Sequence, residues 1–125
     1  MSKGHHKSKL QIAIDRAWKF YEEWRGHEPV TPAFGEKVYA SRLGWDHILN
    51  PSHRRSKADK IRRLDALPLA KKLLTVATTY QEYRYADGFH YYALQAELGG
   101  KRIKVIVSSK KKSGRKYFLS VIILR

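Results

Sequence analysis

The strongest constraint on the fold is the alternating pattern in the last third of the chain. Apolar and polar side chains alternate there, with many β-branched and aromatic residues, through four segments: YQEYRYADG, FHYYALQAELGG, KRIKVIVSSKKKSGRK and YFLSVIILR. This period of two predicts strands. The Asp-Gly, Gly-Gly and Lys/Ser/Gly connections between them are short, which favours antiparallel pairing. We therefore expect a roughly four-stranded antiparallel sheet.

The earlier part of the chain has helical spacing instead. Apolar residues recur every three or four positions from Lys9 to Arg25, and Gly26 ends that run. A second, short helix is expected after Ser41, a good N-cap residue, and it runs through Leu49. Between these helices the sequence predicts a loop, HEPVTPAFG, and a short strand, EKVYAS.

A third helical region is expected from Ser56, because Ser56 and Asp59 have the spacing of a capping box with Asp in place of the usual Glu. This basic helix should continue to about Leu67. Pro68 either breaks it or opens another helix over PLAKKLLTVATTY. The predicted class is α+β, with N-terminal helices packed on the sheet. Residues 1–8 are expected to form a disordered basic arm and 9–125 a single domain.

Alternation also assigns the strand residues to two faces of the sheet. One face is apolar and must be covered by the helices: Tyr83, Tyr85, Tyr92, Leu94, Ala96, Leu98, Ile103, Val105, Val107, Leu119, Val121 and Ile123. The other face has Arg84, Tyr91, Lys104 and Ser120 on four different strands, and Phe118 is expected there as well. A serine buried without a partner costs about 1–3 kcal/mol. The sequence therefore predicts a polar cleft on this face.

The charge of the chain restricts its partners. Lys and Arg number 26 against 11 Asp and Glu, a formal net charge of +15. A positive field of this size attracts polyanions, so nucleic acid, an acidic membrane face or an acidic protein is the expected partner. The absence of Cys excludes disulfides, thiolate zinc sites and cysteine nucleophiles. No apolar run approaches the ~20 residues of a membrane span, and we expect no cofactor.

The stretch GWDHILNPSHRR, residues 44–55, gathers reactive side chains around one break in the chain. His47 and His53 titrate near neutrality and are candidates for the general acid and base of RNA cleavage. A base takes the proton of the ribose 2′-OH, which attacks the adjacent phosphate, and an acid protonates the leaving 5′-oxygen. Cations stabilise the phosphoryl charge, and Arg54 and Arg55 are candidate phosphate anchors.

Each of these residues also has a purely structural interpretation. His47 lies beside Trp45 and is a candidate core histidine, and His53 is a candidate helix cap. The two histidines lack a third metal ligand, and Ser120 lacks the Gly-x-Ser-x-Gly context of a hydrolase nucleophile. The nuclease interpretation depends on the combination of these groups in a basic chain, with Tyr91 available to stack on an unpaired base.

The order of elements resembles the barnase–EndoU–colicin–RelE superfamily of metal-independent endoribonucleases, above all its phage and polymorphic-toxin branches, of the contact-dependent-inhibition type. Those proteins have a short strand, an aromatic-x-His-Ile motif, a second His, a helical segment, and a sheet whose last strand carries Thr or Ser. The counterparts here are KVYASRLGWDHI, SHRR, LPLAKKLL, YYALQAELGGKRIKVIVSS and YFLSVI, spanning Val38 to Ile123.

The resemblance implies cleavage of RNA, often tRNA, to a 2′,3′-cyclic phosphate. It implies a toxin that acts in the cytoplasm, delivered as part of a larger secreted polypeptide, and a cognate acidic immunity protein. The residues carried over by position are His47 and His53 for proton transfer, Arg54, Arg84 and Lys104 for phosphate, and Ser120 for the scissile group.

Two other functions stay open at the level of the sequence. A non-catalytic RNA- or ribosome-binding protein would use the same cations for phosphate contacts alone, and its histidines would be dispensable. A DNA-binding or phage accessory module would prefer duplex DNA to structured RNA. A nuclease instead predicts that loss of His47 abolishes cleavage and leaves binding nearly intact.

Overall fold

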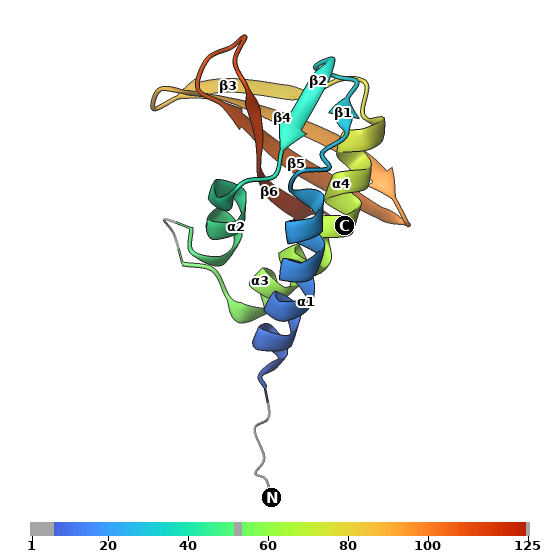
Figure 1. The fold of residues 1–125 in the computed structure, drawn as a ribbon, viewed down its shortest axis with the longest axis vertical. Helices are drawn as coiled ribbons and strands as arrows, with labels where there is room; N and C mark the ends of the chain where they lie inside the picture. The colour runs from blue at the N-terminus through green and yellow to red at the C-terminus, as the bar shows by residue number, and fades with distance from the viewer. Residues whose placement is uncertain (1–6, 52–53, 125) are drawn as a thin grey trace, which may run out of the picture.

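The structure is a computed structural model of the chain and describes residues 7–51 and 54–124 (Figure 1). Four helices and six strands are present in these ranges: α1 (Lys9–Trp24), β1 (Val30–Thr31), β2 (Glu36–Tyr39), α2 (Arg42–Leu49), α3 (Lys57–Asp65), α4 (Leu67–Val76), β3 (Glu82–Ala86), β4 (Phe89–Leu98), β5 (Lys101–Ser109) and β6 (Lys116–Ile123). The α+β class is confirmed. Among residues 7–51 and 54–124, none of the four helices has the length and hydropathy of a membrane-spanning helix.

The sheet has six strands in the order β1-β2-β6-β5-β4-β3. The four expected strands, β3 to β6, pair antiparallel with one another. The expected strand EKVYAS forms β2, which pairs with β6 in parallel, so the prediction of a four-stranded antiparallel sheet was wrong in strand number and in one pairing. The predicted loop HEPVTPAFG contains β1, whose two residues are too few for an alternating pattern to reveal.

Helices α1 and α4 lie side by side on one face of this sheet (Figure 1). Tyr21 and Trp24 of α1 are fully buried, and the Trp24 ring lies 5.0 Å from the ring of Phe118 in β6. The Ser8 side chain accepts a hydrogen bond from the backbone N–H of Gln11 and so caps α1. Ser8 therefore belongs to the helix rather than to the predicted arm, of which residues 1–6 lie outside the described part of the chain.

Two separate helices follow the break in the chain. The Ser56 hydroxyl accepts a hydrogen bond from the Asp59 backbone N–H at 3.1 Å, as half of a capping box requires. The first of the two helices ends at Asp65, and α4 begins at once with Pro68 in its first turn. Proline is tolerated there because the first turn has no intrahelical acceptors for its N–H groups. Of the two alternatives for Pro68, the opening of a new helix is the one observed.

A β-bulge shifts the two faces of β6. Val107 pairs with Phe118 and Ile106 with Ser120, so Leu119 has no residue opposite it in β5. One extra residue reverses the alternation of a strand. Phe118 is consequently buried in the core and Leu119 lines the opposite face, so the predicted placement of these two residues was wrong, whereas that of Ser120 holds.

Beyond the end of β2, helix α2 lies next to β6. The pairing of β2 with β6 ends at Tyr39 and Tyr117, and α2 packs against β6 further along. Gly44 makes this approach possible, because a Cβ at that position would lie 2.4 Å from the Phe118 carbonyl oxygen and 2.9 Å from the Tyr21 hydroxyl. This close contact sets the distance between α2 and the sheet. It therefore also sets the positions of the α2 side chains one turn after Gly44.

Candidate functional site

The sheet face opposite α1 and α4 has a cleft of about 990 Å³. Its walls come from all four antiparallel strands and from α2, α3 and the segment before α3. The lining residues are His47, Arg55, Arg63, Gln81, Glu82, Tyr83, Arg84, Tyr91, Tyr92, Ala93, Lys104, Ile106, Leu119, Ser120 and Ile122. Four cationic side chains thus face one carboxylate in the lining, and this balance suits an anionic ligand.

Six of the eight candidate residues from the sequence line this cleft: His47, Arg55, Arg84, Tyr91, Lys104 and Ser120. Strand register explains why the last four meet, because Arg84 lies opposite Tyr91, Gln95 opposite Lys104, and Ile106 opposite Ser120. Arg54 is exposed and is not among the lining residues. His53 lies outside the described residues, and its predicted role in proton transfer stays a prediction.

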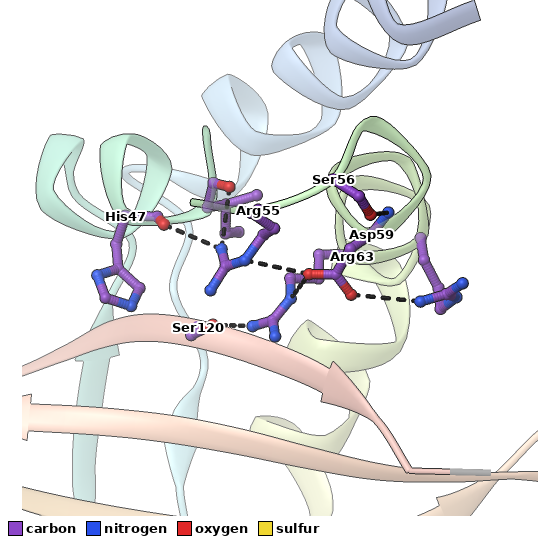
Figure 2. Close-up of polar contacts among 8 residues, drawn as sticks. His47, Arg55, Ser56, Asp59, Arg63 and Ser120 are labelled. Atoms are coloured by element: carbon purple, nitrogen blue, oxygen red, sulfur yellow. Dashed lines mark hydrogen bonds and ion pairs between the residues drawn. The ribbon is translucent and has the colours of Figure 1, made fainter. Parts of the chain in front are cut away.

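His47 reaches the cleft from α2. It follows Gly44 by three residues, and such a pair shares one side of a helix. Because Gly44 is pressed against β6, His47 lies over the same strand, half-buried. Figure 2 shows its imidazole pointing from α2 towards β6, on the side where Ser120 lies. An imidazole at this position can exchange a proton with a ligand held on the sheet.

Ser120 is 97% buried and has a charged partner, because its Oγ accepts a hydrogen bond from Arg63 Nη1 at 2.9 Å. A serine hydroxyl donates one hydrogen bond besides those it accepts. With Arg63 donating to the oxygen, the Ser120 proton is left for another acceptor. The pair can therefore offer an anion both an O–H and the remaining N–H groups of the guanidinium.

Asp59 holds three arginines in place (Figure 2). Its Oδ2 lies 2.9 Å from Arg63 Nε and 3.1 Å from Arg55 Nε, and its Oδ1 lies 3.2 Å from Arg62 Nη1. One carboxylate thus neutralises only part of the charge of three guanidinium groups. Its backbone N–H is in turn bound to the Ser56 hydroxyl, so the helix cap and the arginine cluster are parts of one arrangement.

The Arg55 side chain is buried and bonded to the protein backbone. Its side chain is only 4% exposed, and Nη1 donates to the backbone carbonyls of His47 and Ile48 at 3.1 and 3.0 Å. These contacts join the C-terminal end of α2 to the start of α3. Burial, with the neighbouring Arg63 charge, lowers the pKa of the Arg55 guanidinium, while Asp59 opposes this shift. Arg55 therefore orders the backbone that carries His47, in addition to lining the cleft.

The far side of the cleft is more open. Lys104 Nζ lies 3.2 Å from Glu82 Oε1, and the two side chains are 22% and 56% exposed. The Arg84 guanidinium lies 5.5 Å from the centroid of the Tyr91 ring, a cation–π arrangement that leaves the ring edge and the cation accessible. An exposed ion pair of this kind contributes little to stability, so an anionic ligand can displace the Glu82 carboxylate from Lys104.

The sequence did not predict that Arg63, Asp59 and Glu82 belong to the site, although it predicted Asp59 as part of a helix cap. The i,i+4 spacing of Asp59 and Arg63 was visible, but it also fits an ordinary solvated helix face. The contact of Arg63 with Ser120 spans 57 residues of sequence and has no local signal. In the described part of the chain no three His, Asp or Glu side chains gather as metal ligands.

Comparisons with family models, with curated proteins and with solved structures found no match for this chain.

Proposed function

We propose that the protein is an endoribonuclease of the toxin type that cleaves RNA through its own side chains. The carrying observation is the convergence of a half-buried histidine, the Arg63–Ser120 pair and Lys104 in one cationic cleft. A proton-transfer group and several fixed cations are what cleavage next to a ribose 2′-OH requires. The resemblance to toxin endoribonucleases favours tRNA as the substrate and an acidic immunity protein as the inhibitor.

In the proposed reaction His47 takes the proton of the 2′-OH. The 2′-oxygen attacks the adjacent phosphorus, and the bond from phosphorus to the 5′-oxygen breaks, which leaves a 2′,3′-cyclic phosphate. Lys104 is the one ammonium in the described lining of the cleft and donates the proton that the departing 5′-oxygen takes up. Arg63 and the Ser120 hydroxyl bind the phosphoryl oxygens as their charge grows. Tyr91 and Arg84 contact the base and backbone beside the scissile bond.

The test is cleavage of total tRNA and rRNA by the purified chain in EDTA, with the new ends mapped and their phosphates identified. His47→Ala should lower the cleavage rate by roughly 10²–10⁴-fold while RNA binding stays close to that of the unchanged chain. His27→Ala is the matched control, since His27 is exposed, does not line the cleft, and has its Nδ1 3.0 Å from the Glu23 carbonyl oxygen in α1. Discrete cuts that survive in His47→Ala contradict the proposal.

The second candidate is a non-catalytic RNA-binding protein. The ion pairs of Arg63 with Asp59 and of Lys104 with Glu82 favour this binding function. Cations held by carboxylates can bind phosphate without transferring a proton to it. RNA that is bound but left intact by the unchanged chain would support this function. Preference for duplex DNA over structured RNA in the same assay would instead support the DNA-binding alternative.

A further inference from the structure

A second group of aromatic side chains lies on the opposite face of the sheet, beyond the area that α1 and α4 cover. Tyr83 and Tyr85 of β3 are 41% and 61% exposed. His90 of β4 lies opposite Tyr85 in the register and is half-buried. We call Tyr83, Tyr85 and His90 the aromatic platform. Two exposed rings on the edge strand β3 and a third on the neighbouring strand β4 form an aromatic surface that is open to a ligand.

The rings of the platform are held in fixed positions. The Tyr83 hydroxyl lies 2.6 Å from His90 Nδ1, within hydrogen-bond distance. The His90 ring centroid is 4.8 Å from that of Tyr85 and 5.8 Å from that of Tyr83, and its plane is nearly parallel to the Tyr83 ring. Below them, Tyr83 packs on the buried ring of Tyr92 at 5.2 Å. A preorganised set of rings loses little conformational entropy when a planar ligand stacks on it.

A basic loop borders the platform. The β5–β6 connection has the sequence Lys110-Lys-Lys-Ser-Gly-Arg115, and in Figure 1 it rises beside β3. Lys112 Nζ lies 5.4 Å from the centroid of the Tyr83 ring. The loop is anchored by the buried Lys116, whose Nζ donates to the Lys112 and Gly114 carbonyls and is paired with Glu36. At least one cation, Lys112, therefore lies directly beside the rings, while the acid that contacts the base of the loop, Glu36, is paired with Lys116.

We propose that the aromatic platform and the β5–β6 loop bind a single-stranded segment of RNA outside the cleft, with bases stacked on Tyr83 and Tyr85 and phosphates on Lys112 and its neighbours. This inference rests on the proposed function, which makes RNA the ligand. Stacking rings interleaved with cations are how proteins bind unpaired nucleic acid without reading its sequence. Tyr83 also lines the rim of the cleft, so one strand of RNA can continue from the cleft across the exposed edge strand β3.

The occupant that the chemistry favours is RNA rather than an acidic protein. Carboxylates would pair with the lysines of the loop but would make no stacking contact with the exposed surface of Tyr83 and Tyr85. A duplex would satisfy the cations but keeps its bases stacked on one another, so it also leaves the rings unused. The proposal therefore predicts dependence on both the rings and the cations, for unpaired RNA alone.

The experiment measures binding of a fluorescent oligouridylate of about 12 nucleotides, within the range of known single-strand sites, to the full chain carrying His47→Ala. Tyr85→Ala should weaken binding by roughly 5- to 100-fold, the loss expected for one stacked base. Tyr85→Trp keeps a stacking surface and should retain affinity. Leu43→Ala removes a comparably exposed apolar side chain on α2 and should change nothing. Thermal unfolding of each variant verifies that it is folded.

A second arm separates stacking from charge. Lys112→Gln should reduce the dependence of log Kd on log salt by about 0.7, one phosphate contact on a single strand, whereas Lys19→Gln on α1 should not. Heparin, a polyanion without bases, and a duplex RNA of the same length should bind Tyr85→Ala and the unchanged chain equally well. Equal loss of heparin or duplex binding in Tyr85→Ala would overturn the proposal, as would unchanged oligouridylate binding.

The outcomes also separate this proposal from the proposed function. Cleavage of tRNA by the chain with no effect of Tyr85→Ala on KM or on oligouridylate binding refutes the platform and leaves the nuclease standing. Ring-dependent oligouridylate binding by a chain that never cuts RNA refutes the nuclease and leaves the platform as part of a binding protein.

Discussion

At the scale of single residues, Asp59 has the most consequential role in the candidate site. Its carboxylate contacts Arg55, Arg62 and Arg63, and Arg63 in turn contacts Ser120. No catalytic step is assigned to Asp59, which acts as a positioning residue. Without this carboxylate the two poorly exposed guanidinium groups repel each other, and Arg63 loses the contact that holds it on Ser120.

Asp59→Asn is therefore expected to affect both stability and activity. The free energy of unfolding should fall by about 1–3 kcal/mol, less than for a fully buried pair because the Asp59 side chain is 29% exposed. RNA cleavage should fall through kcat more than through KM, since Arg63 is misplaced while the other cations remain. Urea unfolding and steady-state kinetics measure the two effects. Asp65→Asn, an exposed position on the same helix, is the control; an equal loss in that variant refutes the positioning role.

A substitution of Ser120 tests the hydrogen bond between Arg63 and Ser120 from the serine side. In Ser120→Ala the Arg63 Nη1 group loses its acceptor and the cleft loses a hydroxyl donor. We expect a rate lower by roughly 10- to 100-fold, somewhat less than for a donor in an oxyanion hole, with a stability change of about 1 kcal/mol. Ser120→Thr keeps the hydroxyl and should retain most activity. If the Ala variant cleaves RNA at the full rate, Ser120 has only a structural role.

At the scale of elements, the approach of α2 to β6 decides where His47 lies. Gly44 allows this approach, since any Cβ there meets the Phe118 carbonyl oxygen. Gly44→Ala should force α2 outwards and lower the free energy of unfolding by about 1–3 kcal/mol, the usual cost of overpacking. Cleavage should drop with it because His47 moves away from the sheet. Leu43→Ala, one residue earlier and half exposed, should leave stability and activity unchanged.

The elements themselves show which parts of the fold the sequence could predict. Period and capping residues predicted α1, α2 and the strands β2 to β6 in the correct order and places, because these signals depend on local chemistry. The strand segments read from the sequence nevertheless run two or more residues past the ends of β2, β3, β4 and β5. The bulge at Leu119 had no such signal. An extra residue in one strand is defined only by its partner strand, so the faces of Phe118 and Leu119 could not be read from alternation alone.

At the scale of the whole molecule, the buried tyrosines of the core make the free energy of unfolding decrease at alkaline pH. Burial raises the pKa of Tyr21 and of Tyr92 above the usual phenol value. The folded chain then keeps both phenols protonated where the unfolded chain begins to ionise, near pH 10. Their contribution to stability is fully present below that pH and is lost as the pH rises towards the folded pKa values.

We therefore expect the urea midpoint to fall between pH 9 and pH 11, the range about the usual phenol pKa. In Tyr21→Phe the urea midpoint should fall less over this range. The substitution also removes the hydrogen bond from the Tyr21 hydroxyl to the Ser41 carbonyl at 2.6 Å, so the midpoint should be lower at neutral pH. Tyr85→Phe removes an exposed phenol and is the matched control for loss of a hydroxyl that is not buried. If the unchanged chain, Tyr21→Phe and Tyr85→Phe have parallel pH profiles, burial of Tyr21 does not contribute to the pH dependence of stability.

The local chemistry of this protein could be predicted from the amino-acid sequence alone. Period, caps and turn residues predicted the helices, the strands and the α+β class. Composition gave the net charge of +15 that favours an anionic partner, and alternation placed Arg84, Tyr91, Lys104 and Ser120 on one face. Tertiary structure alone decided the rest. Arg63 meets Ser120 across 57 residues, and α2 packs against β6 beyond the short stretch where β2 pairs with it. Such contacts depend on which elements pack against each other. Periodicity marks the buried face of an element but does not identify the element that covers it.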